Sequence, residues 1–491
     1  MRSPHGYVKT MDDATDFSDF EFHIPKHDDF EAEKPEIAET KGRPLPCRVD
    51  DLDLQQPPGF VGRVADWIDS QCRYPRRRLA VASAIVAIGN IGGLRYEDAR
   101  DNMTANMIAF CVAASSTGKE AVMQAFADLH IASKIQGAVH GAMKSEQEIM
   151  RNVIDQQASY YNIDEIGIFL TKVRNAQKGS GGAAYLEGIF GAIMATFSKA
   201  NSRVLLGGDI KRDLKKVYIA QLSRAKDNGD DEAAEAALQK LRMADQGLER
   251  PFLSLIGYTT PSTFDGVMDG ETATQGLVGR AIIINEPDIN PRPRKAFKKT
   301  DLPMTMAGKL WLMTGRDDGD DGPVEFRGDR VQVPTNPDAD KMLDLILDWL
   351  MEYADDANEE TGEASVAMVR RAFEMIGKIS FILAMPDVER TTEHVRWAFA
   401  YVLAELDGKV RLVFANDHAK TRPEEALAAR ILARLDPDKG VSVSVLANRL
   451  KLSADVIGGI LVKLEERGMA VQKISKRMYR GKKVVNWFPV E

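Results

Sequence analysis

Cysteine is scarce in this chain. Its 491 residues include only Cys47, Cys72 and Cys111. The three show neither the paired spacing of a zinc site nor the even number of a disulfide framework. We therefore expect three reduced thiols and no structural zinc cluster.

Long apolar runs are also missing. No stretch approaches the roughly 18 uninterrupted apolar residues of a membrane-spanning helix, and the first residues lack the charged-then-apolar pattern of a signal peptide. We expect a cytoplasmic protein with no membrane partner. With 44% hydrophobic and 28% charged residues, the chain is long enough for about two to four domains with apolar cores.

Neither sign of charge dominates, but the charge is unevenly distributed. Residues 1–58 hold 14 acidic and 7 basic side chains, whereas residues 421–491 hold 8 acidic and 14 basic ones. Residues 1–56 are polar, lack hydrophobic periodicity and end in proline-containing turns, which predicts a disordered acidic arm. Such an arm either only solubilises the chain or docks on a partner through aromatic pieces such as "DFSDFEFHIP".

Strands and helices alternate in the middle of the chain. Apolar residues at helical spacing over 59–96 predict a pair of helices. Apolar runs at Met107–Val112 and Ser159–Ile163 indicate buried strands, as do "PFLSLIGYTTPSTF" and "GLVGRAIIINEPD". Ser145 followed by Glu148 is a capping box that begins a helix. The alternation predicts a largely parallel, three-layer αβα core.

The stretch "CVAASSTGKEAV" has the features of a phosphate-binding loop. Its small residues allow successive N–H groups to surround phosphates ahead of a helix N-terminus, and Lys119 would reach the β- and γ-phosphates. Glu120 stands where a Ser or Thr ordinarily binds Mg²⁺. It either serves as a hard oxygen ligand itself or marks a site that hydrolyses nucleotide poorly. The predicted nucleotide-binding residues in this loop are Ala113, Ala114, Ser115, Ser116, Thr117, Gly118, Lys119 and Glu120.

Asp164 and Glu165 end the apolar strand Ser159–Ile163, about 45 residues after the loop. Paired carboxylates at a strand end commonly accompany a phosphate loop, one holding Mg²⁺ through water and the other orienting the attacking water. We therefore predict ATP and Mg²⁺ as ligands. Lys119 and Glu165 are then catalytic, and Asp164 with Glu120 binds the metal.

Further candidate residues follow from position along the chain. Thr259 and Thr260 end a later strand, where a polar sensor of the γ-phosphate or ordinary turn chemistry is expected. Arg280 precedes the next strand and is placed for an arginine finger that reaches the nucleotide of a neighbouring subunit, or for a surface salt bridge. Arg370 and Arg371, in the helical region that follows, could sense phosphate.

Two basic regions are candidates for DNA contact. The first lies before the Thr259 strand, where pore hairpins occur in ring motors, and is otherwise a solvated helix face; it comprises Lys211, Arg212, Lys215 and Lys216. The second lies in a C-terminal order of helices and two strands that resembles a winged helix, which binds either DNA phosphates or protein. Its basic residues, around Tyr479, are Lys473, Lys476, Arg477, Arg480, Lys482 and Lys483.

These patterns predict a P-loop NTPase with five parts. They are a disordered acidic arm (1–56), a helical N-terminal segment (57–104), a P-loop ATPase core (105–300), a linker with a helical lid (301–418) and a winged-helix domain (419–491).

With these residues placed, the chain resembles a family of phage and mobile-element proteins that carry a helicase-like P-loop domain, an uncharacterised primase- and helicase-associated domain. The resemblance covers roughly residues 57–415. It rests on "PPGFVGRVADWIDSQCRYPRRRLAVASAIVAIGNIGGLRYE", "ASSTGKE", "SYYNIDEIGIFL", "LIGYTTPSTF", "GLVGRAIIINEP" and "VRRAFEMIGKISFILAM". An acidic residue after the loop lysine is not unusual in that family. The order of parts also looks like ring helicases of the AAA+ type; a RecA-like core stays open, although Asp164-Glu165 favours the AAA+ side.

The resemblance implies a ring-forming, nucleic-acid-dependent ATPase, a hexamer, in phage or mobile-element DNA replication within a bacterial host cell. Its partners would be single-stranded or forked DNA and, through the acidic arm, other replication proteins; without a zinc cluster, priming would come from another protein. The alternatives are a helicase loader or origin-binding initiator, and a nucleotide-gated scaffold with weak hydrolysis. All three share the same site.

Overall fold

The structure is a computed structural model. It describes residues 44–177, 188–264, 276–287 and 291–490, apart from 318, 321, 327, 362, 422–426, 429–430, 433, 437–439, 451 and 480–481. Most of the predicted acidic arm therefore lies outside the described residues. In the part that is described, no helix is both long and apolar enough to cross a membrane.

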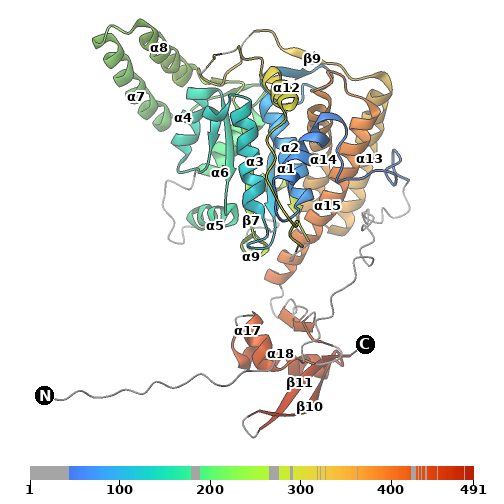
Figure 1. Cartoon of the computed structure of the whole chain (residues 1–491). Helices are drawn as coiled ribbons and strands as arrows, with labels where there is room; N and C mark the ends of the chain where they lie inside the picture. Colours follow the sequence, from blue (N-terminus) through green and yellow to red (C-terminus); the bar gives the residue numbers. More distant parts are fainter. Residues whose placement is uncertain are drawn as a thin grey trace, which may run out of the picture.

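The chain is a mixed α/β protein built on a parallel sheet of five strands (Figure 1). The spatial order is β3-β4-β7-β2-β8, and every neighbouring pair is parallel. The bounds are β2 Ile108–Val112, β3 Val139–His140, β4 Ala158–Ile163, β7 Phe252–Thr259 and β8 Ala281–Asn285. The strands predicted from the apolar runs are thus confirmed. Because all run the same way, the residues after β2, β4, β7 and β8 meet at one edge of the sheet.

Helices cover both faces of the sheet, because alternate strand residues point to opposite sides. Tyr160 donates to the Asn90 carbonyl of α2 (2.9 Å), whereas the next residue, Tyr161, accepts from Asn152 of α4 on the other side (3.2 Å). The helices on these faces include α2 Arg77–Gly92, α3 Lys119–Ala132, α4 Glu146–Gln156, α5 Ile166–Gln177 and α6 Ile189–Ser198. The predicted cap of α4 is present: Ser145 Oγ accepts from Glu148 N (3.1 Å).

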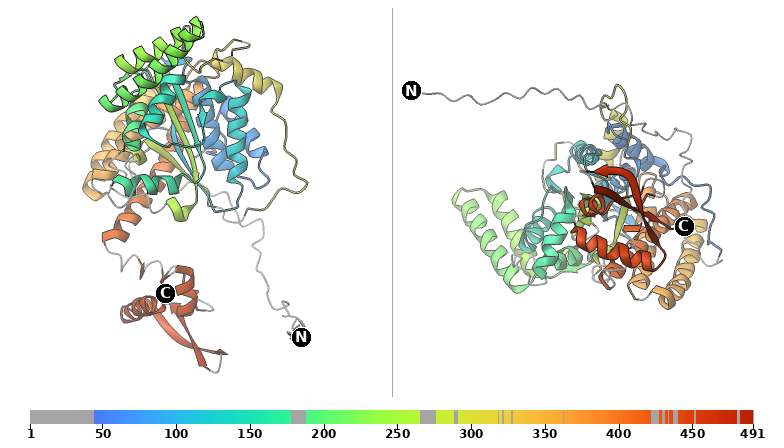
Figure 2. Two further views of the ribbon diagram at one scale, coloured as in Figure 1. Left: turned by 90° about the vertical axis from the view of Figure 1, so that its left-hand side faces the viewer. Right: turned by 90° about the horizontal axis from the view of Figure 1, so that it is seen from below.

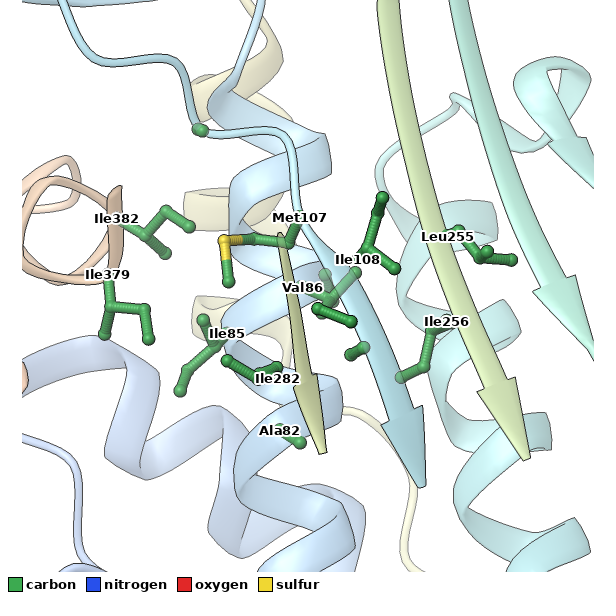
Figure 3. Close-up of a cluster of buried hydrophobic side chains, with 14 of the residues drawn as sticks. Ala82, Ile85, Val86, Met107, Ile108, Leu255, Ile256, Ile282, Ile379 and Ile382 are labelled. Atoms are coloured by element: carbon green, nitrogen blue, oxygen red, sulfur yellow. The ribbon is translucent and has the colours of Figure 1, made fainter. Parts of the chain in front are cut away.

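The N-terminal helix pair and the helical region after residue 300 pack on this core. The bounds are α1 Gly59–Ser70, α12 Met304–Thr314, α13 Pro337–Thr361, α14 Glu363–Ala384 and α15 Thr392–Thr421. Figure 3 shows Ala82, Ile85 and Val86 of α2 between sheet residues such as Ile108 and Ile282 and the α14 residues Ile379 and Ile382. A single cluster of buried apolar side chains extends from Val49 to Leu406. The predicted boundaries at 104 and 300 therefore cross a shared core, and they stay predictions.

Two side chains of α15 form hydrogen bonds with the backbone at the outer edge of β8. Glu405 accepts from Ile283 N (2.8 Å), and Lys409 Nζ donates to the Ala281 carbonyl (2.6 Å). Glu405 and Lys409 are 3.1 Å apart, and both side chains are more than nine-tenths buried. The pair blocks an edge that otherwise presents free backbone groups, and it fixes α15 to the sheet.

Smaller elements stand outside the main sheet. The short strands β1 Tyr96–Asp98 and β9 Val331–Val333 pair in parallel, and β5 Arg203–Val204 pairs with β6 Leu248–Glu249. Between β5 and β6 the helices α7 Gly208–Asp227 and α8 Asp231–Gln246 form a hairpin, which projects from the core in Figures 1 and 2. Because β6 leads into the start of β7, this hairpin emerges at the edge opposite the ends of β2, β4 and β7. The remaining short helices are η2 Gln136–Ala138, α9 Pro261–Phe264 and α11 Leu277–Arg280.

The C-terminal residues form a module with its own core. Its elements are α17 Val443–Leu450, α18 Ala454–Glu466, β10 Ala470–Tyr479 and β11 Lys482–Pro489. The two strands are antiparallel, and Ile457, Leu461 and Trp487 are among the buried residues of a separate apolar cluster. The order of two helices and a hairpin is as predicted; most of the helix expected before them, around residues 423–435, lies outside the described residues.

Candidate functional site

The loop after β2 has the backbone of a cradle. β2 is fully buried and ends at Val112, and α3 begins at Lys119. Ser116 and Gly118 have positive φ values of 60° and 98°, and alternating backbone handedness turns N–H groups to one side. Thr117 Oγ1 closes the turn on the Ala114 carbonyl (2.6 Å). Among the described residues, no hydrogen bond uses the N–H groups of Ser115 to Gly118.

Ala113 differs from the rest of the predicted loop. Its N–H donates to the Thr259 carbonyl (3.1 Å) and continues the ladder between β2 and β7. Ala113 therefore positions the loop, and its N–H is not free for an anion.

Lys119 is buried and has no hydrogen-bond partner for Nζ within the described part of the chain. Its nearest counter-charge is Glu165, with 4.0 Å between Nζ and Oε1. Burial lowers the pKa of Lys119, while the carboxylates of Glu165 and Asp164 act in the opposite direction. An ammonium that is desolvated without hydrogen bonds costs free energy unless an anion compensates it. The position is therefore suited to an anionic ligand.

The Asp164–Glu165 pair lies where β4 ends. Asp164 is exposed, and its Oδ1 accepts the Glu165 N–H (2.9 Å). Glu165 has a φ of 50°, a left-handed conformation that is uncommon outside glycine. Strained residues of this kind concentrate at functional sites. Glu165 thus combines a left-handed backbone with the carboxylate that is nearest to the Lys119 ammonium.

A hydroxyl cluster ends β7, which lies between β2 and β4. Thr263 Oγ1 lies 2.7 Å from Thr259 Oγ1 and 3.0 Å from Thr260 Oγ1. The first turn of α5 packs closely against this cluster, since a Cβ on Gly167 would lie only 2.6 Å from Thr259 Oγ1. Both threonines are thus next to the loop and the carboxylate pair, although each already has a hydroxyl partner.

Glu120 makes no contact with these groups that would define its role. It is exposed in the first turn of α3, and no hydrogen bond or ion pair involving it is found among the described residues. Its predicted role as a metal ligand stays a prediction. In the same part of the chain, no group of three His, Cys, Asp or Glu side chains is arranged to hold a metal ion alone.

The connection between α1 and α2 forms a further wall of the site, which sequence reasoning missed. A Cβ on Gly118 would lie 3.2 Å from Tyr74 Cβ and 3.3 Å from the Tyr74 carbonyl oxygen. The fully buried Arg76 donates through Nε to the Thr117 carbonyl (2.5 Å). Residues 73–76 therefore fix the loop from outside. Only the dense run "RYPRRR" could have suggested a special role for this connection.

Arg280 lies far from this site within its own chain. It immediately precedes β8, whose first residue, Ala281, pairs with Ile108 at the start of β2. Loop 113–118 follows the other end of β2, so the length of the strand, about 13 Å, separates the two. Arg371 of α14 joins Arg280 there: a Cβ on Gly279 would overlap the Arg371 guanidinium, and burial followed by the charge of Arg280 lowers the pKa of Arg371.

The predicted basic run on α7 is neutralised within its own hairpin. Lys211 and Lys215 both pair with Asp245 of α8 (2.7 and 2.8 Å). Arg212 pairs with Asp209, and Lys216 with Asp213. None of the four is a free cation, and their role in DNA contact stays a prediction.

The predicted basic residues of the C-terminal module fall on its hairpin. Lys473 is exposed on β10 and lies over the Phe488 ring, 4.9 Å from its centroid. Lys476 and Arg477 belong to β10, and Lys482 and Lys483 to β11; Arg480 lies outside the described residues. This set is on a strand pair, as a basic wing requires.

Comparison with protein-family models and with curated proteins finds no match to the chain. Function is therefore inferred from the geometry of the site.

Proposed function

We propose that residues 113–119, with Asp164 and Glu165, bind and hydrolyse a nucleoside triphosphate, ATP. One observation carries the proposal: the buried Lys119 ammonium lacks a hydrogen-bond partner among the described residues and lies at the start of a helix, behind a small-residue loop and 4.0 Å from a strand-end carboxylate. A triphosphate supplies the acceptors that this ammonium lacks and the charge that the helix N-terminus favours.

The roles follow from the positions of the groups. The free N–H groups of the loop and Lys119 would bind the phosphate oxygens. Glu165 would orient the attacking water, and Thr259 or Thr260 would contact the terminal phosphate from between the two motifs.

Mg²⁺ fits this donor set as a partner of the nucleotide. The ion prefers one or two carboxylates together with substrate phosphates and water, and Asp164 is an exposed carboxylate at the strand end. When bound, the ion would neutralise charge that develops on the phosphates. Asp164 would hold it, and Glu120, exposed in the first turn of α3, would be a second oxygen ligand.

We infer that Arg280 acts on a second copy of the chain. It lies at the opposite end of β8 from its own phosphate loop, about the length of that strand away, so it would act on the nucleotide of a neighbouring chain. This arrangement supports a ring-forming homo-oligomer, a hexamer, with the order of parts of AAA+ motors and a C-terminal winged helix. The proposed activity is ATP-driven translocation on single-stranded or forked DNA in phage or mobile-element replication.

The test is ATP hydrolysis by the purified chain with and without single-stranded DNA, over concentrations that span assembly. We expect DNA to stimulate turnover, Lys119→Ala to abolish it, and Arg280→Ala to reduce it while nucleotide still binds. If the wild type binds ATP but never hydrolyses it, the motor assignment is wrong. Glu120, a carboxylate in place of a hydroxyl, then favours a nucleotide-gated scaffold or loader.

A further inference from the structure

The segment between β8 and α12 is strongly basic. Its sequence over 291–300, "PRPRKAFKKT", contains five basic and no acidic residues. Arg292, Lys295, Lys298 and Lys299 are all exposed, and among the described residues none of them takes part in an ion pair or a hydrogen bond. We call these four residues the basic strip. The strip differs in this respect from α7, where each of the four predicted cations pairs with an aspartate.

The backbone of this segment is held against α1 by its fifth cation. Arg294 donates from Nη1 to the Cys72 carbonyl (2.6 Å) and from Nη2 to Asp69 Oδ2 (2.5 Å). Farther along, Thr300 Oγ1 accepts from Gln71 Nε2 (2.9 Å). Figure 2 shows the stretch as an extended coil along the outside of the helices. A fixed backbone presents its side chains to a ligand at a lower entropic cost.

The same contacts connect the strip to the phosphate loop. Arg294 N donates to the Arg73 carbonyl (2.8 Å), so the segment holds the connection between α1 and α2. That connection touches Gly118 through Tyr74 and the Thr117 carbonyl through Arg76. A ligand that displaces the strip would therefore act on residues that shape loop 113–118.

We propose that the basic strip binds the phosphate backbone of single-stranded nucleic acid. Lys295 and Lys298 line one pocket with Asp53 and Asp66, but no ion pair joins the strip to these carboxylates among the described residues. An anchored row of exposed cations without ion-pair partners suits sequence-independent contact with successive phosphates. A membrane surface fits less well, because the strip has no exposed large apolar side chain to enter the lipid. Residues 73–76 contact both the strip segment and the nucleotide loop, so binding at the strip would change the loop; we call this coupling the relay. Only the relay, and not the contact with nucleic acid, rests on the proposed function.

The contact is tested by anisotropy of a fluorescein-labelled 25-nucleotide oligothymidylate without nucleotide. One variant carries Arg292→Gln, Lys295→Gln, Lys298→Gln and Lys299→Gln. The matched control loses the same charge through Lys211→Gln, Arg212→Gln, Lys215→Gln and Lys216→Gln. We expect at least tenfold weaker binding for the strip variant, with a salt slope lower by about 0.7 for each lost phosphate contact. We expect a smaller loss for the control, because each of its cations already pairs with an aspartate.

Several results would overturn the contact. The first is an equal loss of oligonucleotide affinity in the strip variant and the control, and the second is a loss of affinity in the control alone. The third is a strip variant that binds the oligonucleotide like the wild type but no longer binds phosphatidylserine vesicles. The milder variant Lys298→Gln with Lys299→Gln should show part of the effect, which keeps the test valid if the fourfold change disturbs folding.

The relay is tested with Arg294→Gln, which removes the anchor and leaves the strip. At saturating oligonucleotide, which compensates for affinity lost with the anchor, we expect at least fivefold weaker stimulation of ATP hydrolysis; Arg294→Lys should retain part of the stimulation. Full stimulation in Arg294→Gln would overturn the relay. If the wild type hydrolyses no ATP at all, the proposed function fails, and the anisotropy result still decides the contact.

Discussion

Lys119 shows how single residues at this site carry costs that a purely structural role does not explain. Its ammonium is buried without a hydrogen bond among the described residues, and the nearest carboxylate is 4.0 Å away. Glu165, which bears that carboxylate, has a strained φ of 50°. Such local violations are expected where function is selected over stability.

Replacing Lys119 should therefore separate stability from binding. We expect Lys119→Met to leave the free energy of unfolding unchanged or to raise it by up to about 1 kcal/mol, because a buried charge is removed and the partly exposed Glu165 is hydrated. Urea unfolding measures this change, and the affinity for a fluorescent ATP analogue should fall at least 100-fold. A loss of several kcal/mol would instead make Lys119 a structural residue.

His130 predicts a dependence of stability on pH. It is fully buried between the Phe126 carbonyl (2.7 Å) and Asn90 Nδ2 (3.1 Å), and burial lowers its pKa from 6.5 to about 4. Because the unfolded chain takes up this proton near pH 6.5 and the folded chain only near 4, stability falls as the pH falls through this window. Between pH 7 and 5 the loss is about 2 kcal/mol.

The control for that prediction is His130→Gln, which cannot titrate. Urea unfolding at pH 7 and pH 5 should show a loss about 2 kcal/mol smaller in the variant than in the wild type. Equal losses in the two proteins would show that His130 does not titrate as its burial implies.

At the level of elements, apolar runs predicted the strands that build the site, and hydrophobic periodicity predicted the helices. β2, β4, β7 and β8 are short apolar runs followed by polar residues, and a parallel sheet brings their ends together whatever the loops between them. Two kinds of feature carried no such local signal. Tyr96–Asp98 pairs with Val331–Val333, and the connection at 73–76 contacts loop 113–118; both join segments distant in sequence.

Charge shows the same limit of sequence reasoning. The α7 run is basic in sequence, but α8 returns Asp245 against it and neutralises it. Segment 291–300 has a usable signal in its sequence, five cations among ten residues without an acid, which we did not connect with a function from sequence alone. Sequence supplies the charges, whereas folding decides which of them remain without partners.

The attachment of α15 to β8 yields a prediction for an element. Lys409→Met would leave Glu405 buried without its counter-charge, and burial already raises the pKa of that carboxyl. We expect the free energy of unfolding to fall by about 3 kcal/mol. The double variant with Glu405→Met should lose less than the sum of the two single changes. Additive losses in urea unfolding would show that the pair does not act as a unit.

At the scale of the whole molecule, the residues of the phosphate loop and the arginines Arg280 and Arg371 lie at opposite ends of the strands of one sheet. Loop 113–118 follows the end of β2, whereas Arg280 and Arg371 lie at the start of β8. If Arg280 acts on a nucleotide as proposed, that nucleotide belongs to a neighbouring chain. The supposed lid residue Arg371 lies with Arg280, so we expect it to act at the same interface rather than on its own nucleotide.

Mixing inactive variants tests this arrangement. Lys119→Ala chains lack the loop lysine but keep Arg280, and Arg280→Ala chains have the reverse. In a mixed oligomer, some interfaces combine an intact loop with an intact arginine, so we expect hydrolysis clearly above that of either variant alone. Activity no higher than the sum of the separate variants would place Arg280 outside the reaction.

The most direct test of the central claim is equilibrium binding of ATP with Mg²⁺ to the wild type, Glu165→Gln and Lys119→Met, measured by titration calorimetry. We predict binding to the wild type, severalfold tighter binding to Glu165→Gln because the ammonium loses the carboxylate that competes with phosphate, and none to Lys119→Met. Absence of binding to the wild type, or equal binding to all three proteins, would contradict the assignment of this loop as a nucleotide site.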